Sequence, residues 1–267
     1  MLSRRILTAF LLLPIILAII FFAPYWLFAL FLLTLLAIAG YEWCELSHIH
    51  NKLSIISYIA GLYIVTLGSY FVPVSVIFIC AFLWWCFASF MIFVFPKGKT
   101  YWQRYAWMRL FVGILILVPF IDAIDYLWLQ PSGSIWLTYI LTVIWCADTS
   151  AYFIGSRFGK TKLAPLVSPK KSVQGLLGGI AGGLLIYVIF GCVFQSTAFF
   201  SLSFLVLMIV SILFSVSGDL TESMVKRFAD VKDSSQLLPG HGGILDRIDS
   251  LTAAVPIFAM GLWLLSS

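Results

Sequence analysis

The sequence predicts an all-α polytopic membrane protein with about nine transmembrane helices, and three observations support this fold class. Mean hydropathy is +1.07, 62% of the 267 residues are hydrophobic and only 10% are charged, a composition outside the range of water-soluble domains. Apolar runs recur along the chain, each close to the roughly 17 to 20 residues that a helix needs to cross a bilayer. These runs are continuous instead of alternating, which favours helices over a closed barrel of strands.

Nine apolar spans follow one another along the chain. The first comes after Arg4 and Arg5, and we interpret it as a retained helix because no small-residue cleavage site of a signal peptide follows it. Pro24 separates it from the second span, and Pro73 separates the third from the fourth. The predicted spans are 6–23, 25–40, 54–72, 74–95, 109–129, 134–155, 174–194, 199–217 and 250–266.

The basic residues predict the orientation of the chain. With these spans, all 16 Lys and Arg residues fall on one side of the membrane, and the opposite connections carry none. Because basic residues stay in the cytoplasm, we expect a cytoplasmic N-terminus and an external C-terminus. The net charge of +5 therefore describes one membrane face, and no nucleic-acid partner is indicated.

The chain divides into two regions with different polar content. Residues 1–130 contain apolar helices with short links, and we expect them to form a scaffold for lipid access or dimer contacts. Residues 131–267 contain two longer cytoplasmic loops, 156–173 and 218–249, and most of the motif-like polar residues. The second region is therefore expected to be catalytic.

Two features of the chain are given structural interpretations. The five scattered cysteines contain no CxxC pair, so neither a zinc site nor a disulfide framework is indicated. One short link in the N-terminal region is interpreted as a solvated turn, with a metal-binding HxH as the alternative; its ionisable residues are Glu42, Glu45, His48 and His50.

The first long loop is basic and follows an acid inside a span. Asp148 lies a few residues from the cytoplasmic end of its span, where a carboxylate costs on the order of 2.5–3.5 kcal/mol, so it needs a partner or a wet cavity. A structural hydrogen bond is the alternative to a functional role. The loop itself predicts polyphosphate binding at a tight SPKKS turn before Gly175, or else a solvated loop on anionic lipid. Its basic residues are Arg157, Lys160, Lys162, Lys170 and Lys171.

Glycines in the span after this loop predict close helix packing. Gly175, Gly179 and Gly183 share one helical face, at a spacing that lets two membrane helices approach closely. We expect these residues to shape a wall instead of taking part in chemistry.

The second long loop concentrates acids where spans meet the cytoplasm. Asp219, Glu222 and Lys226 share a face if the eighth span continues as a helix, and Asp246 and Asp249 share a face at the start of the ninth. Like charges at this spacing repel, and a divalent cation would offset that repulsion. Ligands that are all oxygen suit Mg²⁺. The two loops together predict phosphoryl-group chemistry at the membrane surface.

Residues 223–249 read SMVKRFADVKDSSQLLPGHGGILDRID. This stretch resembles the signature of the phosphatidate cytidylyltransferases, also called CDP-diacylglycerol synthases, of the bacterial type. The resemblance is specific over about residues 145–256. It implies conversion of CTP and phosphatidic acid to CDP-diacylglycerol and pyrophosphate with one or two Mg²⁺ ions, at the cytoplasmic face of the inner membrane. It also implies a homodimer.

The resemblance and the residue chemistry together imply roles for individual side chains. Asp219, Asp246 and Asp249 are expected to hold Mg²⁺, and His241 to orient the phosphate or the loop. The expected catalytic residues are Asp219, Asp246, Asp249, Lys226, Arg247 and His241. The expected substrate-binding residues are Asp148, Lys160, Lys162, Ser168, Lys170, Lys171, Arg227, Lys232, Gly242 and Gly243.

Two other functions fit parts of this pattern. A CTP-dependent polyprenol kinase would share the metal and nucleotide chemistry but would transfer the γ-phosphate. A transporter would also contain an acid within a span and a glycine-rich helix. The transporter is disfavoured because most ionisable residues lie at one membrane face instead of along a path across the bilayer.

Overall fold

A computed structural model describes residues 13–194, 199–235, 237 and 242–266. It confirms the all-α membrane fold, with eight helices in the described residues long and apolar enough to cross a membrane. They are α2 (Tyr25–Leu46), α3 (Lys52–Ser69), α4 (Val74–Val94), α6 (Ala106–Leu129), α7 (Gly133–Phe158), α8 (Val173–Phe194), α9 (Leu202–Phe228) and α10 (Leu245–Ser266). A shorter apolar helix, Leu13–Phe22, precedes them, and the remainder of the first predicted span lies outside the described residues.

The helices extend further toward the polar segments than hydropathy predicted. Helix α9 continues to Phe228 instead of ending at 217, and α10 begins at Leu245 instead of 250. Much of the expected loop 218–249 is therefore helical, and only residues 229–244 connect the two helices. The expected common face of Asp219, Glu222 and Lys226 lies on a continuous helix.

The basic segment between α7 and α8 contains a small β-hairpin. Strands β1 (Lys162–Ala164) and β2 (Ser168–Ser172) pair antiparallel, with Lys162 opposite Ser172. The sequence predicted a tight turn at SPKKS, but this segment is strand β2. Because successive strand residues face opposite sides, adjacent lysines of β2 are directed apart.

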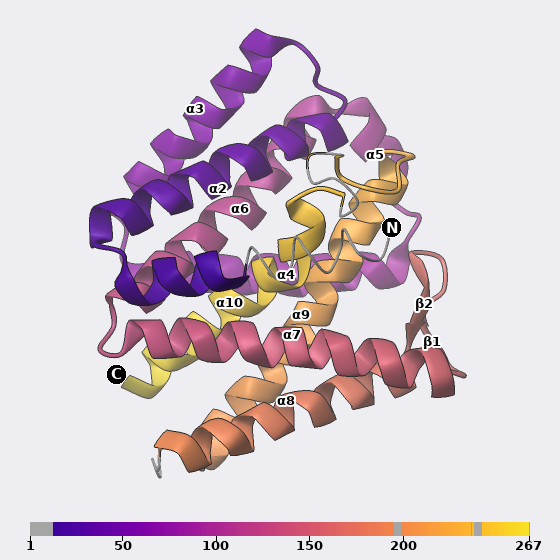
Figure 1. Cartoon of the computed structure of the whole chain (residues 1–267). Coiled ribbons are helices and arrows are strands. Elements are labelled where there is room, and N and C mark those ends of the chain that lie inside the picture. Colours follow the sequence, from indigo (N-terminus) through magenta and orange to yellow (C-terminus); the bar gives the residue numbers. More distant parts are fainter. Residues whose placement is uncertain (1–12, 195–198, 236, 238–241, 267) are drawn as a thin grey trace.

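Glycines allow α7 and α8 to pack closely, as their spacing predicted. A Cβ atom on Gly175 would lie 3.0 Å from the carbonyl oxygen of Ala151, and one on Gly179 would lie 3.1 Å from that of Ala147. The two helices lie side by side along most of their length (Figure 1). The outer surface of the helices carries exposed apolar side chains: Ile64 on α3 is 70% exposed, which suits hydrocarbon and not water.

The polar connections gather at one end of the helical bundle (Figure 1). Short helix α5 (Lys99–Arg104) contacts the end of α9, where the rings of Trp102 and Phe228 have centroids 5.8 Å apart. Lys99 Nζ donates to Asp230 Oδ1 at 2.8 Å in the connection after α9. The hairpin lies at the same end, against α9. The functional residues predicted from distant segments are therefore brought to a single end.

Candidate active site

Three buried or half-buried ion pairs connect the hairpin, α9 and α10. Lys171 Nζ, from strand β2, lies 2.6 Å from Asp219 Oδ2 on α9. Lys226 Nζ, two turns further along α9, lies 3.1 Å from Glu222 Oε1 and 2.6 Å from Asp246 Oδ1 on α10. The hairpin, α9 and α10 thus form one charged cluster, as the two-loop interpretation predicted.

Helix α7 adds a further carboxylate to this cluster. Asp148 Oδ2 accepts a hydrogen bond of 3.0 Å from Ser250 Oγ on α10, and the charges of Asp219 and Lys171 act on it. Asp249 accepts a hydrogen bond from the N–H of Ser250 and interacts electrostatically with Asp219, Lys171 and Lys226. Asp148 therefore makes the structural hydrogen bond that was considered for it, and it also lies within reach of the charges of the cluster.

Asp246 organises the connection before α10. Its Oδ2 atom accepts from Ser234 N at 3.0 Å, from Ser234 Oγ at 3.0 Å and from Gly243 N at 2.9 Å. Together with Lys226 at Oδ1, these donors occupy both of its carboxylate oxygens. Asp246 is thus already fully hydrogen-bonded to the protein.

The acids differ in how well they fit the predicted Mg²⁺. In the part of the chain that the structure describes, no group of three or more His, Cys, Asp or Glu side chains is arranged to hold a metal ion. Asp219 and Asp249 offer the oxygen ligands that Mg²⁺ prefers, and Asp219 is in contact with the side chains of Lys171 and Ser223. Asp246 fits less well, because binding a metal would require it to release Lys226 or the loop.

Two adjacent glycines fit the tight connection that Asp246 holds. Gly242 has φ of +80°, in the left-handed region where a side chain is strained. At Gly243, a Cβ atom would collide with Ser234 Oγ and with the Glu42 carboxylate. These glycines were predicted to bind substrate. The backbone angle of Gly242 and the close packing around Gly243 are sufficient reasons for glycine at both positions.

Glu42 is a residue whose place the sequence analysis missed. It lies inside α2, not in a solvated turn, and its exposure is 0%. Its Oε1 accepts from Ser235 Oγ at 2.7 Å and Ile244 N at 2.8 Å, and its Oε2 accepts from Leu245 N at 2.7 Å and Ser234 Oγ at 3.2 Å. The available signal was its position beside Trp43, within an apolar run too continuous for a solvated link. Its neighbour Glu45 does lie in a partly exposed pair with His50, at 3.5 Å.

The remaining predicted residues surround the cluster at greater exposure. Ser168 is half-buried at the start of β2, where it pairs with Ala164. His241 lies outside the described residues. The exposed predicted residues are Lys160, Lys162, Lys170, Arg227, Lys232 and Arg247. Lys170 and Lys171 were expected to share a phosphate, but only Lys171 contacts the acids.

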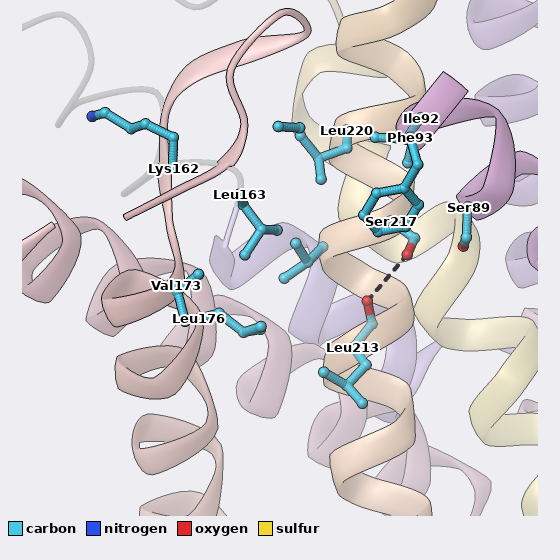
Figure 2. Close-up of a pocket in the computed structure, with 12 residues that line it drawn as sticks. Ser89, Ile92, Phe93, Lys162, Leu163, Val173, Leu176, Leu213, Ser217 and Leu220 are labelled. Atoms are coloured by element: carbon cyan, nitrogen blue, oxygen red, sulfur yellow. Dashed lines mark hydrogen bonds between the residues drawn. The ribbon is translucent and has the colours of Figure 1, made fainter. Parts of the chain in front are cut away.

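An apolar cavity of about 390 Å³ is lined by α9 and by strand β1 of the hairpin, the two elements that the Lys171–Asp219 pair connects. Its walls come from α4, β1, α8 and α9, and Figure 2 shows Leu213, Leu176 and Leu163 around it. Leu220 on its wall directly follows Asp219 in the chain. Lys162 lies at the hairpin edge, with its amino group turned away from the apolar walls (Figure 2). The apolar cavity and the charged cluster thus share two elements, the hairpin and α9.

This combination defines a class of protein. Lysines and carboxylates at one end of a transmembrane helical bundle, beside an apolar cavity, are typical of a membrane enzyme whose substrates include phosphate and hydrocarbon groups.

Comparison with known proteins identifies the family. The model described as "Cytidylyltransferase family" matches residues 3–265, so the chain belongs to this family of nucleotidyltransferases. The phosphatidate cytidylyltransferase of Pseudomonas aeruginosa is 40% identical over 265 residues, which are 98% of this chain and 97% of the relative. That of Haemophilus influenzae is 36% identical over 282 residues, covering 97% and 98%. That of Bacillus subtilis is 42% identical over 141 residues, about half of each chain. The resemblance seen in the signature is confirmed, and it extends to the N-terminal helices.

Proposed function

We propose that this protein is a phosphatidate cytidylyltransferase, which converts CTP and phosphatidic acid to CDP-diacylglycerol and pyrophosphate. The observation that carries the proposal is that the hairpin and α9 bear both the Lys171–Asp219 pair and walls of the apolar cavity. A substrate with a phosphate group and acyl chains matches both surfaces. The names of the full-length relatives support the same substrates.

The reaction proposed is a direct displacement. An oxygen of the lipid phosphate attacks the α-phosphorus of CTP, the bond from that phosphorus to the bridging oxygen breaks, and pyrophosphate leaves with the electron pair. The attacking phosphate is already anionic near neutral pH, so it needs little help from a general base. Catalysis then depends mainly on positioning and on neutralising charge.

The residues of the cluster divide these tasks. Lys171 and Lys226 are the cations nearest the acids, and we assign them to the phosphate oxygens of the two substrates. Asp219 and Asp249 would hold Mg²⁺, which supplies positive charge to the triphosphate. Asp246 keeps the connection before α10 in place. This assignment modifies the expectation that all three aspartates are metal ligands.

The cavity is assigned to an acyl chain of the lipid. Moving a chain from the bilayer into an apolar protein cavity yields little free energy, because lipid tails are as apolar as leucine. The cavity therefore contributes to alignment more than to affinity: a chain held beside Leu220 places its headgroup near Asp219 and Lys171.

The location follows from the distribution of basic residues. We assign the site to the cytoplasmic face of the inner membrane, where CTP is available, because every Lys and Arg was predicted on that side. A homodimer is the proposed assembly, with the N-terminal helices as candidate contacts.

One labelling experiment tests the function. Purified protein is incubated with phosphatidic acid vesicles, Mg²⁺ and CTP labelled at either the α- or the γ-phosphate. Transfer of the α-label to lipid, with release of pyrophosphate, is expected. Transfer of the γ-label to a polyprenol would indicate the kinase instead, and the absence of transfer to any lipid would favour the transporter.

A further inference from the structure

Glu42 lies on a transmembrane helix of the N-terminal region, yet all four of its hydrogen-bond donors belong to the catalytic region. Two are side-chain hydroxyls of the connection after α9, and two are backbone N–H groups where α10 begins. Within the described residues, none of the ion pairs includes Glu42. A fully buried carboxylate without a cation is costly unless hydrogen bonds satisfy it. The donors of the connection and of α10 provide those bonds.

The two backbone donors explain why an acid occupies this position. The first N–H groups of a helix have no partner within the helix, and the helix dipole makes this end attractive to negative charge. Glu42 accepts from the N–H groups of Ile244 and Leu245, immediately before and at the first residue of α10. It therefore caps α10 from a different helix.

The same contacts connect Glu42 to the charged cluster. Ser234 Oγ lies 3.2 Å from Glu42 Oε2 and 3.0 Å from Asp246 Oδ2, so one hydroxyl lies between the two carboxylates. The other oxygen of Asp246 contacts Lys226. Asp249 follows one turn later on α10. The angular position of the first turn of α10 sets where these side chains face, and Glu42 fixes that turn.

The helix end that carries Glu42 is itself firmly held. Trp43 Nε1 donates to the carbonyl oxygen of Arg109 at 2.8 Å, and both side chains are buried. Arg109 in turn donates to the carbonyl oxygen of Trp102 at 2.6 Å. A support that is fixed on α2 and α6 can hold the start of α10 in one geometry.

We infer that Glu42 is a positioning residue for the transferase reaction: from α2 it holds Ser234, Ser235 and the first turn of α10, so that Lys226 and Asp249 face the substrates. This inference rests on the proposed function. It assigns to the N-terminal region a direct part in shaping the site, beyond that of a scaffold.

The principal test compares Glu42→Gln with Glu45→Gln. Glutamine keeps the size of the side chain, but its amide nitrogen cannot accept the backbone N–H that the replaced oxygen accepts, so that hydrogen bond at the start of α10 is lost, while the serine hydroxyl beside it can turn and accept from the amide. We expect kcat with saturating CTP and phosphatidic acid to fall by about ten- to a hundredfold, because misplacing catalytic groups by about 1 Å has effects of this order. The KM for CTP should change by less than about threefold, since the binding lysines remain. Glu45→Gln, at a partly exposed position one turn away, should match the wild type.

A second variant covers the case in which Glu42→Gln fails to fold. Ser235→Ala removes one donor and leaves Glu42 with three, so insertion and yield should be preserved. Its kcat should fall by about three- to tenfold, the effect of one hydrogen bond, again with little change in KM. Combining it with Glu42→Gln should add less than the product of the single effects, because both act through the same contact.

The outcomes separate this inference from the proposed function. If the wild-type protein transfers no α-label, the proposed function fails before any variant is compared. If the wild type is active and both Glu42→Gln and Ser235→Ala retain its kcat, the positioning role is refuted. A loss of thermal stability with unchanged kcat would also refute it, since that result is the one expected of a purely structural contact.

Discussion

Replacing Lys226 by Met should show how strongly the site depends on its buried cation. Lys226 contacts Glu222 at 3.1 Å and Asp246 at 2.6 Å, and the three side chains are only 13%, 7% and 9% exposed. Methionine has a similar length but no charge. Asp246 would retain its three donors from the connection, whereas Glu222 would lose Lys226, and its Oε2 already has no hydrogen-bond partner in the structure.

The expected magnitude follows from this loss. Removing one partner of a buried ion pair costs about 3–5 kcal/mol, because the other charge is left uncompensated. For a chain of this size each kcal/mol corresponds to roughly 2–4 °C, so the Tm should fall by roughly 6–20 °C. Transferase activity should also be lost, since Lys226 is assigned to phosphate.

The assay is thermal unfolding of the detergent-purified protein, and a double variant makes it specific. Adding Glu222→Gln to Lys226→Met removes the orphaned charge, so more than half of the lost Tm should return while activity stays absent. The reasoning would be refuted if the single variant changed the Tm by less than about 2 °C, or if the double variant were less stable than the single one.

Three further results are expected. Asp219→Asn should lower kcat by several orders of magnitude, and its Tm should stay near normal because the pair with Lys171 is partly exposed. The control Asp230→Asn, which breaks the exposed pair with Lys99, should leave kcat unchanged. Equal activities of the two variants would exclude Asp219 from the site. Lys171→Ala should raise the KM for CTP or lipid by about ten- to a hundredfold and Lys170→Ala by much less, and the reverse order would contradict the strand geometry. A reporter inserted near Gly98 should lie in the cytoplasm and one fused to the C-terminus outside, and a cytoplasmic C-terminus would overturn the nine-span topology.

The sequence predicted the membrane helices well because hydropathy and length determine which segments cross a bilayer. It underestimated α9, since the last turns carry polar residues such as Glu222 and Lys226. Those residues remain helical and buried because they pair with α10, and a hydropathy pattern does not report tertiary pairing. The hairpin was missed for a related reason: a strand of five residues containing two lysines lacks the apolar alternation that indicates strands.

The sequence predicted which residues gather at the site better than it predicted the contacts between them. Charge and spacing indicated Asp219, Asp249, Lys171 and Lys226, and the structure brings these residues together. The contacts of Glu42 were not predictable, because its partners lie 192 to 203 residues away in the chain. Local patterns contain no information about such distant partners.

The β-hairpin links the region proposed for the lipid chain to the region proposed for the phosphates. Strand β1 forms part of the cavity wall, and strand β2 carries the lysine that neutralises Asp219. Because the strands are hydrogen-bonded to each other, the cavity wall and Lys171 belong to one small structural unit. The wall proposed for the acyl chain and the cation proposed for a phosphate are therefore carried by the same hairpin. Because the Lys171–Asp219 pair is partly exposed, separating it costs little free energy, so a phosphate or a cation can replace either partner with little loss of stability.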